Sequence, residues 1–419
     1  MSEQIATNDS GIAILHASRE ASKRQISVGI NCLRMEAGYA GGVTTYALGL
    51  LRGFAAVGGP CRFIIYVTRR NQVLFEDFRD VSKFKIVVVD DRWLSLKRTV
   101  CRGVSLTHSE HLYKLSCDSA FRNIQRKMEA ESDILYTPTV ILECFDNRKP
   151  TVLSMHDIQH LHYPEFFGWA RRTSRKIGYG LSARHATYLQ ASSEYIKSDL
   201  LQHFPWLSEK QIEVIPSGAL VETFAAPAAA GILSQYGLPE RFLFFPAQLW
   251  PHKNHATVLK ALKVIEIQHQ VKIPLILTGE KFSAAAEIFG FIADQSMDYV
   301  RYLGKVPFAD MVALYQRAAF VLTATLHESS SLPILEAAAA GTPVICSRIP
   351  PIEELGRVLR LNCFDPLDVN GLARLVWELW HDAKTACAQA AYNQEHIGVY
   401  SWANTAQKYI RLFERVVGS

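Results

Sequence analysis

The chain lacks the features that would assign it to a small secreted, membrane-spanning or repetitive class of protein. Its eight cysteines are scattered and form no Cys-x-x-Cys pair, which argues against a disulfide framework and against a cysteine zinc site. Residues 1–25 hold one short apolar patch, Ile12 to Leu15, too short for a signal peptide or a membrane span. We therefore expect a cytoplasmic protein with reduced thiols and a flexible N-terminal extension over residues 1–25.

The chain also lacks a strong charge of either sign. Its 45 lysines and arginines nearly balance 40 aspartates and glutamates, which leaves a formal net charge of +5. This is far from the dense basic stripe of a nucleic-acid-binding protein, so no nucleic-acid partner is expected. No Asp-x-Asp motif lies in a metal-binding context, so no metal is expected either.

The chain is long and alternates regularly between two kinds of segment. Its 419 residues, 49% of them apolar, suit two domains of about 200 residues each. Short β-rich runs take turns with helical segments, which is typical of parallel α/β sheets. We predict two facing doubly wound domains, over residues 26–222 and 223–399. The predicted strands are 26–30, 62–67, 84–89, 133–136, 151–155 and 212–216, then 242–246, 275–278, 300–303, 320–323 and 343–347.

The most informative stretch is HESSSLPILEAAAAGTPV, from His327 to Val344. Proline has a fixed φ that suits a first helical turn, so Pro333 indicates a helix start. Gly341 followed by Pro343 indicates the stop. We therefore predict a helix from about Pro333 to Ala340.

This helix begins behind three serines, Ser329, Ser330 and Ser331. Its free N–H groups and its dipole would favour a phosphate there. Glu328 and Glu336 flank the turn and could accept hydrogen bonds from a polyhydroxylated ligand. Taken alone, the same residues could be a serine cap and a glutamate that favours the helix dipole.

Three other positions could touch such a ligand at the carboxyl ends of predicted strands. Lys253 lies in a loop between a strand and a helix, where it suits a diphosphate, although lysines are usually solvated surface residues. Gly41 and Gly42 would let backbone approach a ligand, or simply form a tight turn. His156 directly follows a predicted strand, and its alternative role is a structural histidine bonded to Asp157.

The order and spacing of these motifs resemble the GT-B retaining glycosyltransferases of the family 4 type (glycosyl transferases group 1). The resemblance covers most of the chain, and each motif taken singly is weak. It implies a GT-B fold of two Rossmann-like domains around a central cleft, with a last helix over residues 400–419 that packs back on the first domain. The motifs are GYAGGVTTYALGLL, LSMHDIQH, ASSEYIKSDLLQHF, IEVIPSGA, FPAQLWPHKNHATVLKAL, LILTGE, YLGKVPFADMVALYQRAAFVLTATLHESSSLPILEA and FDPLDVNGLARLV.

The resemblance implies a metal-independent enzyme without a cofactor that transfers a sugar with retention of configuration. The donor would be a UDP- or GDP-sugar, with GDP-mannose as one candidate. The acceptor would be a glycan or a lipid-linked saccharide, in the synthesis of a bacterial surface polysaccharide such as lipopolysaccharide.

The resemblance also implies roles for single residues. His156 would contact the transferred sugar, Lys253 the leaving diphosphate and Glu328 the sugar hydroxyls, and these three are the predicted catalytic residues. Glu336 would bind the ribose. The predicted nucleotide-sugar-binding residues are Gly41, Gly42, Gln248, Lys253, Ser329, Ser330, Ser331, Leu332 and Glu336.

Gln248 is the most consequential departure from the family pattern, which usually has an arginine there. Glutamine can donate a hydrogen bond to a phosphate but cannot neutralise it. Either Lys253 and the helix N-terminus suffice, or Arg348 or His252 compensates. Gln248 also favours an alternative, a catalytically inactive subunit that binds a nucleotide sugar. Sugar-nucleotide epimerases and phosphorylases share the two-domain architecture, but the glutamate spacing and Lys253 favour a transferase.

Two basic segments are candidates for the acceptor side. The segment FFGWARRTSRK, Phe166 to Lys176, mixes aromatic and basic residues, as would a helix on an anionic membrane surface, or else it is a solvated helix face. The stretch Arg92 to Lys127 is basic without clear periodicity and could be an acceptor-side insertion. Peripheral membrane association is therefore one interpretation.

Overall fold

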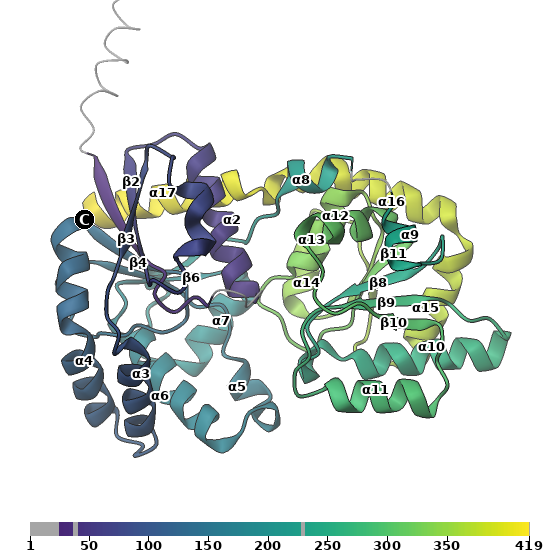
Figure 1. Ribbon diagram of the computed structural model, residues 1–419, viewed down its shortest axis with the longest axis horizontal. Helices are drawn as coiled ribbons and strands as arrows, with labels where there is room; N and C mark the ends of the chain where they lie inside the picture. The colour runs from purple at the N-terminus through teal and green to yellow at the C-terminus, as the bar shows by residue number, and fades with distance from the viewer. Residues whose placement is uncertain (1–24, 37–40, 228–230, 419) are drawn as a thin grey trace, which may run out of the picture.

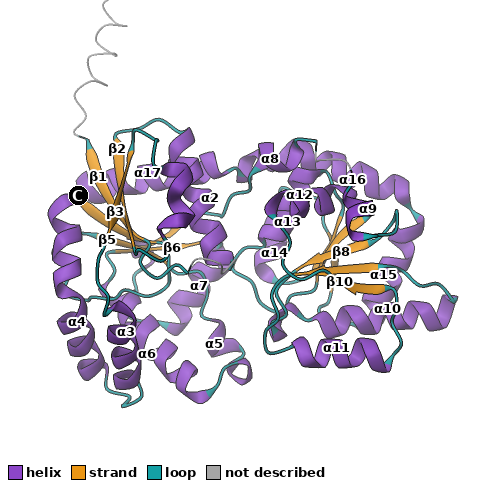
Figure 2. Cartoon of the chain, in the orientation of Figure 1, coloured by secondary structure: helices purple, strands orange, loops and turns teal. Residues whose placement is uncertain are grey.

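The computed structural model describes residues 25–36, 41–227 and 231–418 (Figure 1). These residues form two lobes side by side, each built on a parallel sheet with helices on both faces (Figure 2). The predicted fold class is thereby confirmed. Residues 1–24, where we predicted a flexible extension, lie outside the described residues. So do residues 38–40 of the glycine-rich turn.

The N-terminal sheet has seven strands in the order β3-β2-β1-β4-β5-β6-β7, and all its pairings are parallel. The order reverses between β1 and β4. Its strands are β1 (Ile26–Asn31), β2 (Cys61–Val67), β3 (Phe84–Val88), β4 (Ile134–Thr137), β5 (Thr151–Ser154), β6 (Tyr188–Ala191) and β7 (Ile212–Val214). Its helices are α2 (Gly42–Ala56), α3 (Leu94–Ser105), α4 (Glu110–Glu131), α5 (Gln159–His162), α6 (Trp169–His185) and α7 (Glu194–His203), with 3-10 turns η1 (Gln72–Phe78), η2 (Pro164–Phe166) and η3 (Glu209–Gln211).

The C-terminal sheet has six parallel strands in the order β10-β9-β8-β11-β12-β13, so here the reversal lies between β8 and β11. Its strands are β8 (Leu243–Pro246), β9 (Leu275–Thr278), β10 (Val300–Tyr302), β11 (Phe320–Thr323), β12 (Val344–Ser347) and β13 (Asn362–Phe364). Its helices are α8 (Val221–Ala225), α9 (Ile232–Tyr236), α10 (His255–His269), α11 (Ala285–Asp294), α12 (Phe308–Arg317), α13 (Leu332–Ala340), α14 (Pro350–Leu355), α15 (Val369–His381) and α16 (Ala383–His396), with turns η4 (Pro251–Lys253) and η5 (Ile397–Tyr400). The predicted boundary at residues 222 and 223 falls inside α8, whose Phe224 is buried in the second domain.

The sequence prediction missed two strands, β6 and β13. Strand β6 is only four residues long and contains Gln190, a polar residue that does not suit a buried strand pattern. The structure satisfies that side chain, because its amide donates to the Ile215 carbonyl at 2.7 Å and its oxygen accepts from the Tyr46 hydroxyl at 3.3 Å. Strand β13 is a three-residue edge strand.

The basic stretch without clear periodicity is also ordered, as most of α3 and α4. These helices show no clear helical periodicity of apolar residues in the sequence, because several apolar side chains are exposed to solvent. Those that are about half exposed are Leu96, Val100, Leu112 and Leu115. Within the described part of the chain, no helix is both long and apolar enough to span a membrane.

The last helix, α17 (Trp402–Gly418), leaves the second domain and packs against α2 of the first (Figure 1). Trp402 is buried where three glycines give it space. A Cβ atom on Gly49 would lie 2.2 Å from the Trp402 ring, and one on Gly53 would lie 2.2 Å from its carbonyl oxygen. A Cβ atom on Gly218 would come within 2.5 Å of its backbone nitrogen. Glycine at these positions therefore allows α17 to pack.

A hydroxyl network fixes α17 further along. The Tyr409 hydroxyl lies 2.6 Å from that of Tyr46 and 3.1 Å from that of Tyr136, and it also contacts Ser154 at 2.9 Å. All four side chains are buried, so these bonds satisfy groups that would otherwise be costly to bury.

The two domains also touch across the cleft. Glu354 of α14 accepts hydrogen bonds from the backbone nitrogens of Glu194, at 2.9 Å, and Tyr195, at 2.7 Å. These are the first two residues of α7, so a carboxylate of one domain caps a helix of the other. The Tyr163 hydroxyl likewise donates to the Leu326 carbonyl at 3.1 Å.

The packing of Trp402 predicts that Gly49→Ala lowers the free energy of unfolding by about 1–3 kcal/mol, because the added methyl group overlaps the indole ring. Gly103→Ala is the matched control, since a Cβ atom there meets nothing within 4 Å and alanine favours a helix interior. Urea unfolding of both variants measures the difference. Equal stability of Gly49→Ala and wild type would contradict the prediction.

Candidate donor-binding site

Lys253 and Glu328 lie 75 residues apart in the sequence and meet in space. Lys253 closes the turn after β8, and Glu328 lies in the loop after β11. These are the two neighbouring strands between which the sheet order reverses, the place where ligands bind in open α/β sheets. The Lys253 ammonium forms an ion pair with the Glu328 carboxylate, and both side chains remain partly exposed.

Backbone contacts hold the two loops together. The carbonyl of His252 accepts from the Leu326 nitrogen at 2.8 Å and from the Thr325 hydroxyl at 3.1 Å. Asn254 then adopts a left-handed conformation, φ 58°, at the start of α10. Asparagine is among the residues that tolerate this region best, so the turn that presents Lys253 is encoded locally.

The N-terminus of α13 offers unused hydrogen-bond donors. The predicted helix is confirmed to within one residue, since it begins at Leu332. No described residue accepts a hydrogen bond from the backbone nitrogens of Ser330, Ser331 or Leu332, and Ser331 places no side-chain cap on the helix. The Ser331 hydroxyl is buried without a partner among the described residues. The helix end therefore has donors and a dipole ready for an anion.

Glu336 is held in place by a residue that the sequence analysis missed. The Tyr315 hydroxyl, on the neighbouring helix α12, donates to Glu336 Oε2 at 2.6 Å. Burial raises the pKa of Glu336, and the bond from Tyr315 lowers it in part. One carboxylate oxygen is thus fixed by the protein. Tyr315 carries no sequence signal for this role, because a buried tyrosine on a packed helix looks like an ordinary core residue.

The position of Gln248 depends on a glycine. Gly279, with φ 120°, follows β9, and a Cβ atom there would lie 2.5 Å from the Ala247 carbonyl oxygen. Gln248 Oε1 accepts from the indole nitrogen of Trp250 at 3.1 Å. This close approach explains why the LILTGE motif contains a glycine. The sequence analysis included this motif but assigned no role to its glycine.

The two candidates for replacing the missing positive charge, His252 and Arg348, differ in their surroundings. Burial, helped by the neighbouring Lys253, lowers the pKa of His252 to about 2. The imidazole is therefore neutral at pH 7. Arg348 is exposed after β12, where its guanidinium lies 3.4 Å from the Cys363 carbonyl oxygen.

The N-terminal domain contributes His156, Gly41 and Gly42. His156 Nε2 lies 2.9 Å from the Pro138 carbonyl oxygen, so Nε2 carries the proton. This corrects the alternative in which Asp157 was the partner. Burial lowers the pKa of His156, opposed by that hydrogen bond.

Gly41 and Gly42 lie at the N-terminus of α2. Gly41 is the N-cap residue, with φ −89°, which many residues can adopt. Among the residues that the structure describes, a Cβ atom on Gly42 would meet no atom within 4 Å. The described residues therefore give no steric reason for glycine at position 42.

Two family models match the chain over most of its length. Residues 40–222 match the Glycosyltransferase Family 4 model, and residues 235–396 match the model named Glycosyl transferases group 1. The two matches correspond to the two sheets of the structure.

Curated relatives include sugar transferases of bacterial surface polysaccharides. The chain is 24% identical over 270 residues to O-antigen chain mannosyltransferase B of Escherichia coli, which covers 63% of this chain and 70% of that protein. It is 25% identical over 242 residues to the serotype-specific mannosyltransferase WbdA of the same species, covering 55% of this chain but only 29% of that longer protein. It is also 26% identical over 215 residues to D-inositol 3-phosphate glycosyltransferase of Corynebacterium urealyticum, covering 48% and 51%.

Solved structures share the fold at low sequence identity. HepE from Anabaena, solved with UDP and glucose, has a TM-score of 0.71 and 17% identity, covering 93% of this chain and all of that one. WaaG, a glycosyltransferase of lipopolysaccharide biosynthesis, has a TM-score of 0.67 and 13% identity, covering 92% and 99%. With the family matches and the two-domain fold, these findings show that the chain belongs to the GT-B glycosyltransferases of family 4, the glycosyl transferases group 1.

Proposed function

We propose that this glycosyltransferase moves a hexosyl group from a UDP- or GDP-sugar to a saccharide acceptor, with retention of configuration and without a metal ion. A mannosyl group from GDP-mannose is the first candidate. The observation that carries the proposal is the Lys253–Glu328 ion pair at the reversal of the sheet order, beside the uncapped N-terminus of α13. The mannosyltransferase relatives support the choice of sugar.

Donor binding would exchange the partners of the ion pair. The diphosphate carries more negative charge than one carboxylate, so it would attract the Lys253 ammonium away from Glu328. Glu328 could then accept hydrogen bonds from hydroxyl groups of the sugar. The α13 N–H groups would bind the same diphosphate, and Glu336 Oε1 would accept from the ribose hydroxyls while Tyr315 holds Oε2.

The reaction would depend mainly on stabilising the leaving group. The bond between the anomeric carbon and the diphosphate oxygen breaks, and a bond from that carbon to the acceptor hydroxyl oxygen forms on the same face of the sugar. The departing diphosphate oxygen takes the hydroxyl proton. Lys253 and the α13 dipole would stabilise the charge that develops on the diphosphate, without a protein group that acts as acid or base.

The N-terminal domain, where we propose that the acceptor binds, contains a basic pocket. A cavity of about 630 Å³ in the N-terminal domain is lined by arginines from α3, α6 and the segment after β1, and Glu143 lies within it. This carboxylate pairs with two of them, Arg34 and Arg98. We infer an acceptor with an anionic part, such as a phosphate of a lipid-linked saccharide. The lining arginines are Arg34, Arg98, Arg102, Arg171 and Arg175.

Peripheral membrane contact would bring such an acceptor to this pocket. The predicted membrane helix begins later than Phe166, because Pro164–Phe166 forms a 3-10 turn, and α6 runs from Trp169 to His185. Trp169 is 56% exposed and lies beside His108, at the turn between α3 and α4. Exposed Leu112 and Leu115 extend this apolar surface along α4. We propose that this surface rests on anionic lipid.

The second candidate function is an inactive subunit that binds a nucleotide sugar, which the glutamine at position 248 favours. Donor hydrolysis or transfer by the purified wild-type chain, measured with UDP- and GDP-sugars, separates the two. Turnover above that of the Lys253→Ala protein supports the enzyme. Tight binding without any turnover supports the inactive subunit.

We expect Lys253→Ala to lower kcat for donor hydrolysis or transfer by about 10²–10³-fold, because the charge that develops on the leaving diphosphate loses its cation. Lys260→Ala removes an exposed lysine from α10 and serves as the control. Steady-state kinetics with the preferred donor measure both. A Lys253→Ala protein with wild-type kcat would exclude the proposed role.

We expect Glu336→Gln to weaken nucleotide binding by about tenfold or more, since hydrogen bonds to a charged group are worth about 1.5–3 kcal/mol. Tyr315→Phe should weaken it less, because the carboxylate remains but loses its orientation. Calorimetric titrations with UDP, GDP and ADP give the affinities, with exposed Glu287→Gln as the control. Wild-type affinity in Glu336→Gln would place the ribose elsewhere.

We expect the chain to sediment with vesicles that contain phosphatidylglycerol and not with phosphatidylcholine alone. Trp169→Ala should reduce the bound fraction several-fold, and added salt should reduce it further, since each basic residue near an anionic surface contributes about 1 kcal/mol. Leu367→Ala is the control, because it removes an even more exposed apolar residue from the other domain. If both variants bind like wild type, the membrane surface lies elsewhere or does not exist.

A further inference from the structure

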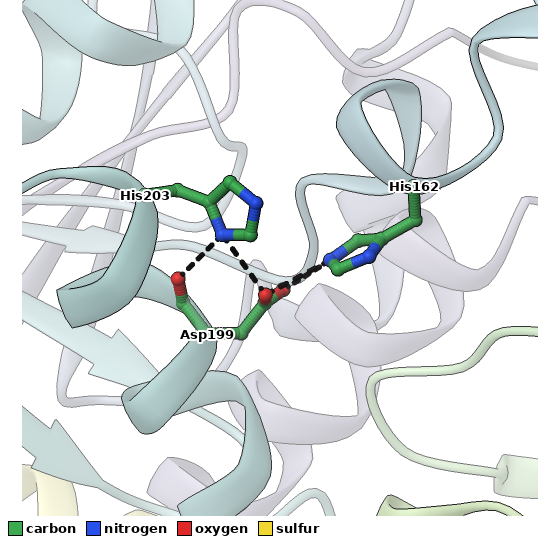
Figure 3. Close-up of side chains that lie close together, drawn as sticks. All are labelled: His162, Asp199 and His203. Carbon is green, nitrogen blue, oxygen red and sulfur yellow. Dashed lines mark hydrogen bonds and ion pairs between the residues drawn. The ribbon is translucent and has the colours of Figure 1, made fainter.

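Three metal-ligating side chains come together on the N-terminal domain, and none of them is among the residues proposed to bind the donor. They are His162 at the end of α5, and Asp199 and His203 on α7 (Figure 3). The ligand atoms of these three side chains all lie within 4.8 Å of one another. Asp199 and His203 are four positions apart on one helix, so they share a face. The sequence carries this Asp-x-x-x-His spacing, but His162 is added only by the fold.

The distances suit a shared ion. His162 Nε2 lies 2.9 Å from each Asp199 carboxylate oxygen, and His203 Nδ1 lies 3.1 Å from Oδ1. Ligands on a tetrahedral zinc ion with bonds of about 2 Å lie about 3.3 Å apart. The ring centres of His162 and His203 are 5.2 Å apart, with an angle of 71° between the planes. Two imidazoles can therefore approach one ion from different directions.

The charge of Asp199 is the reason to expect a cation. Its side chain is only 4% exposed, and the two imidazoles are its partners among the residues that the structure describes. A buried carboxylate normally pairs with a lysine, an arginine or a metal ion. The two histidine side chains are 26% and 29% exposed, so an ion could enter from solvent between them.

A third imidazole lies beside the cluster. His327 of the C-terminal domain has its ring centre 5.1 Å from that of His162. It is 6% exposed, and its Nε2 is buried with no partner among the described residues. His327 is not one of the three groups within 4.8 Å, but it is an unsatisfied ligand at the edge of the site, next to Glu328 in the sequence.

We propose that His162, Asp199 and His203 bind one divalent transition-metal ion of the zinc type, with water completing the coordination. His203 would bind through Nδ1, so its proton would sit on Nε2, and its present hydrogen bond to the Asp199 carbonyl would be given up. Two imidazoles and one carboxylate are typical ligands of zinc and are less suited to magnesium or calcium.

The ion would stiffen the part of the N-terminal domain that contacts its neighbour. It would join α5 to α7. Tyr163, the residue after His162, donates to the Leu326 carbonyl of the other domain, and the first residues of α7 donate to Glu354. Metal binding should therefore raise the thermal stability of the closed two-domain arrangement. The site uses none of the residues proposed to bind the donor, so its existence does not depend on the transferase proposal.

The test uses the full chain without an oligohistidine tag, stripped with EDTA and dialysed. Titration with Zn²⁺ in a calorimeter should show one tight equivalent and a rise in the melting temperature. Titration with Co²⁺ should give the visible absorption of a four- or five-coordinate site with nitrogen ligands. His203→Gln and Asp199→Asn should each weaken Zn²⁺ binding at least tenfold, whereas His111→Gln, which removes an exposed histidine from α4, should not.

The melting temperature of each metal-free variant shows whether it is folded. Because Asp199 is buried, Asp199→Asn is the variant at risk, and the half-buried His203→Gln keeps the test decisive. The proposal is overturned if the stripped wild-type chain takes up no Zn²⁺, or if folded His203→Gln binds Zn²⁺ as tightly as wild type.

Discussion

The return of the last helix to the first domain is the constraint on which the two-domain arrangement depends. Trp402 fills a space that exists only because residues 49, 53 and 218 are glycines. Tyr409, seven positions further along α17, completes a buried hydroxyl network. The chain therefore crosses between the domains twice, near Ala219 and near Ser401, where the two crossings pair as a β-bridge. These paired segments join the two lobes, and the hydrogen bond from Ser192 to Ser329 brings the carboxyl ends of β6 and β11 close together.

The electrostatics of the donor pocket follow from its position in the second sheet. Lys253 and Glu328 neutralise each other at the reversal of the second sheet, while the α13 N-terminus keeps donors that no described residue uses. In the proposed function, one ammonium and the backbone donors of α13 would bind the diphosphate without a second cation. This is how an enzyme could work with Gln248 even though burial lowers the pKa of His252 to about 2.

Contacts between the domains connect the pocket to the proposed metal site. The loop from Leu326 to Ser331 carries Glu328 and is held from the other domain by Tyr163 and Ser192, which donate to the Leu326 and Ser329 carbonyls. His162, beside Tyr163, belongs to the histidine and aspartate cluster. The same short loop therefore carries Glu328 of the proposed donor site and also contacts the N-terminal domain.

The sequence by itself determined the alternation of strands and helices, the helix at Pro333 and the motifs around Lys253 and Glu328, because these depend on local turn chemistry and on short-range apolar patterns. It did not predict strand β6, where the buried Gln190 side chain is satisfied by hydrogen bonds with Tyr46 and Ile215. Nor did it predict helices α3 and α4 of the basic stretch, which expose apolar side chains to solvent. Only the tertiary structure decided that Lys253 pairs with Glu328, that Tyr315 holds Glu336, and that His162 joins Asp199 and His203. Each of these joins residues from separate elements, and such contacts depend on packing between elements, which no local pattern encodes.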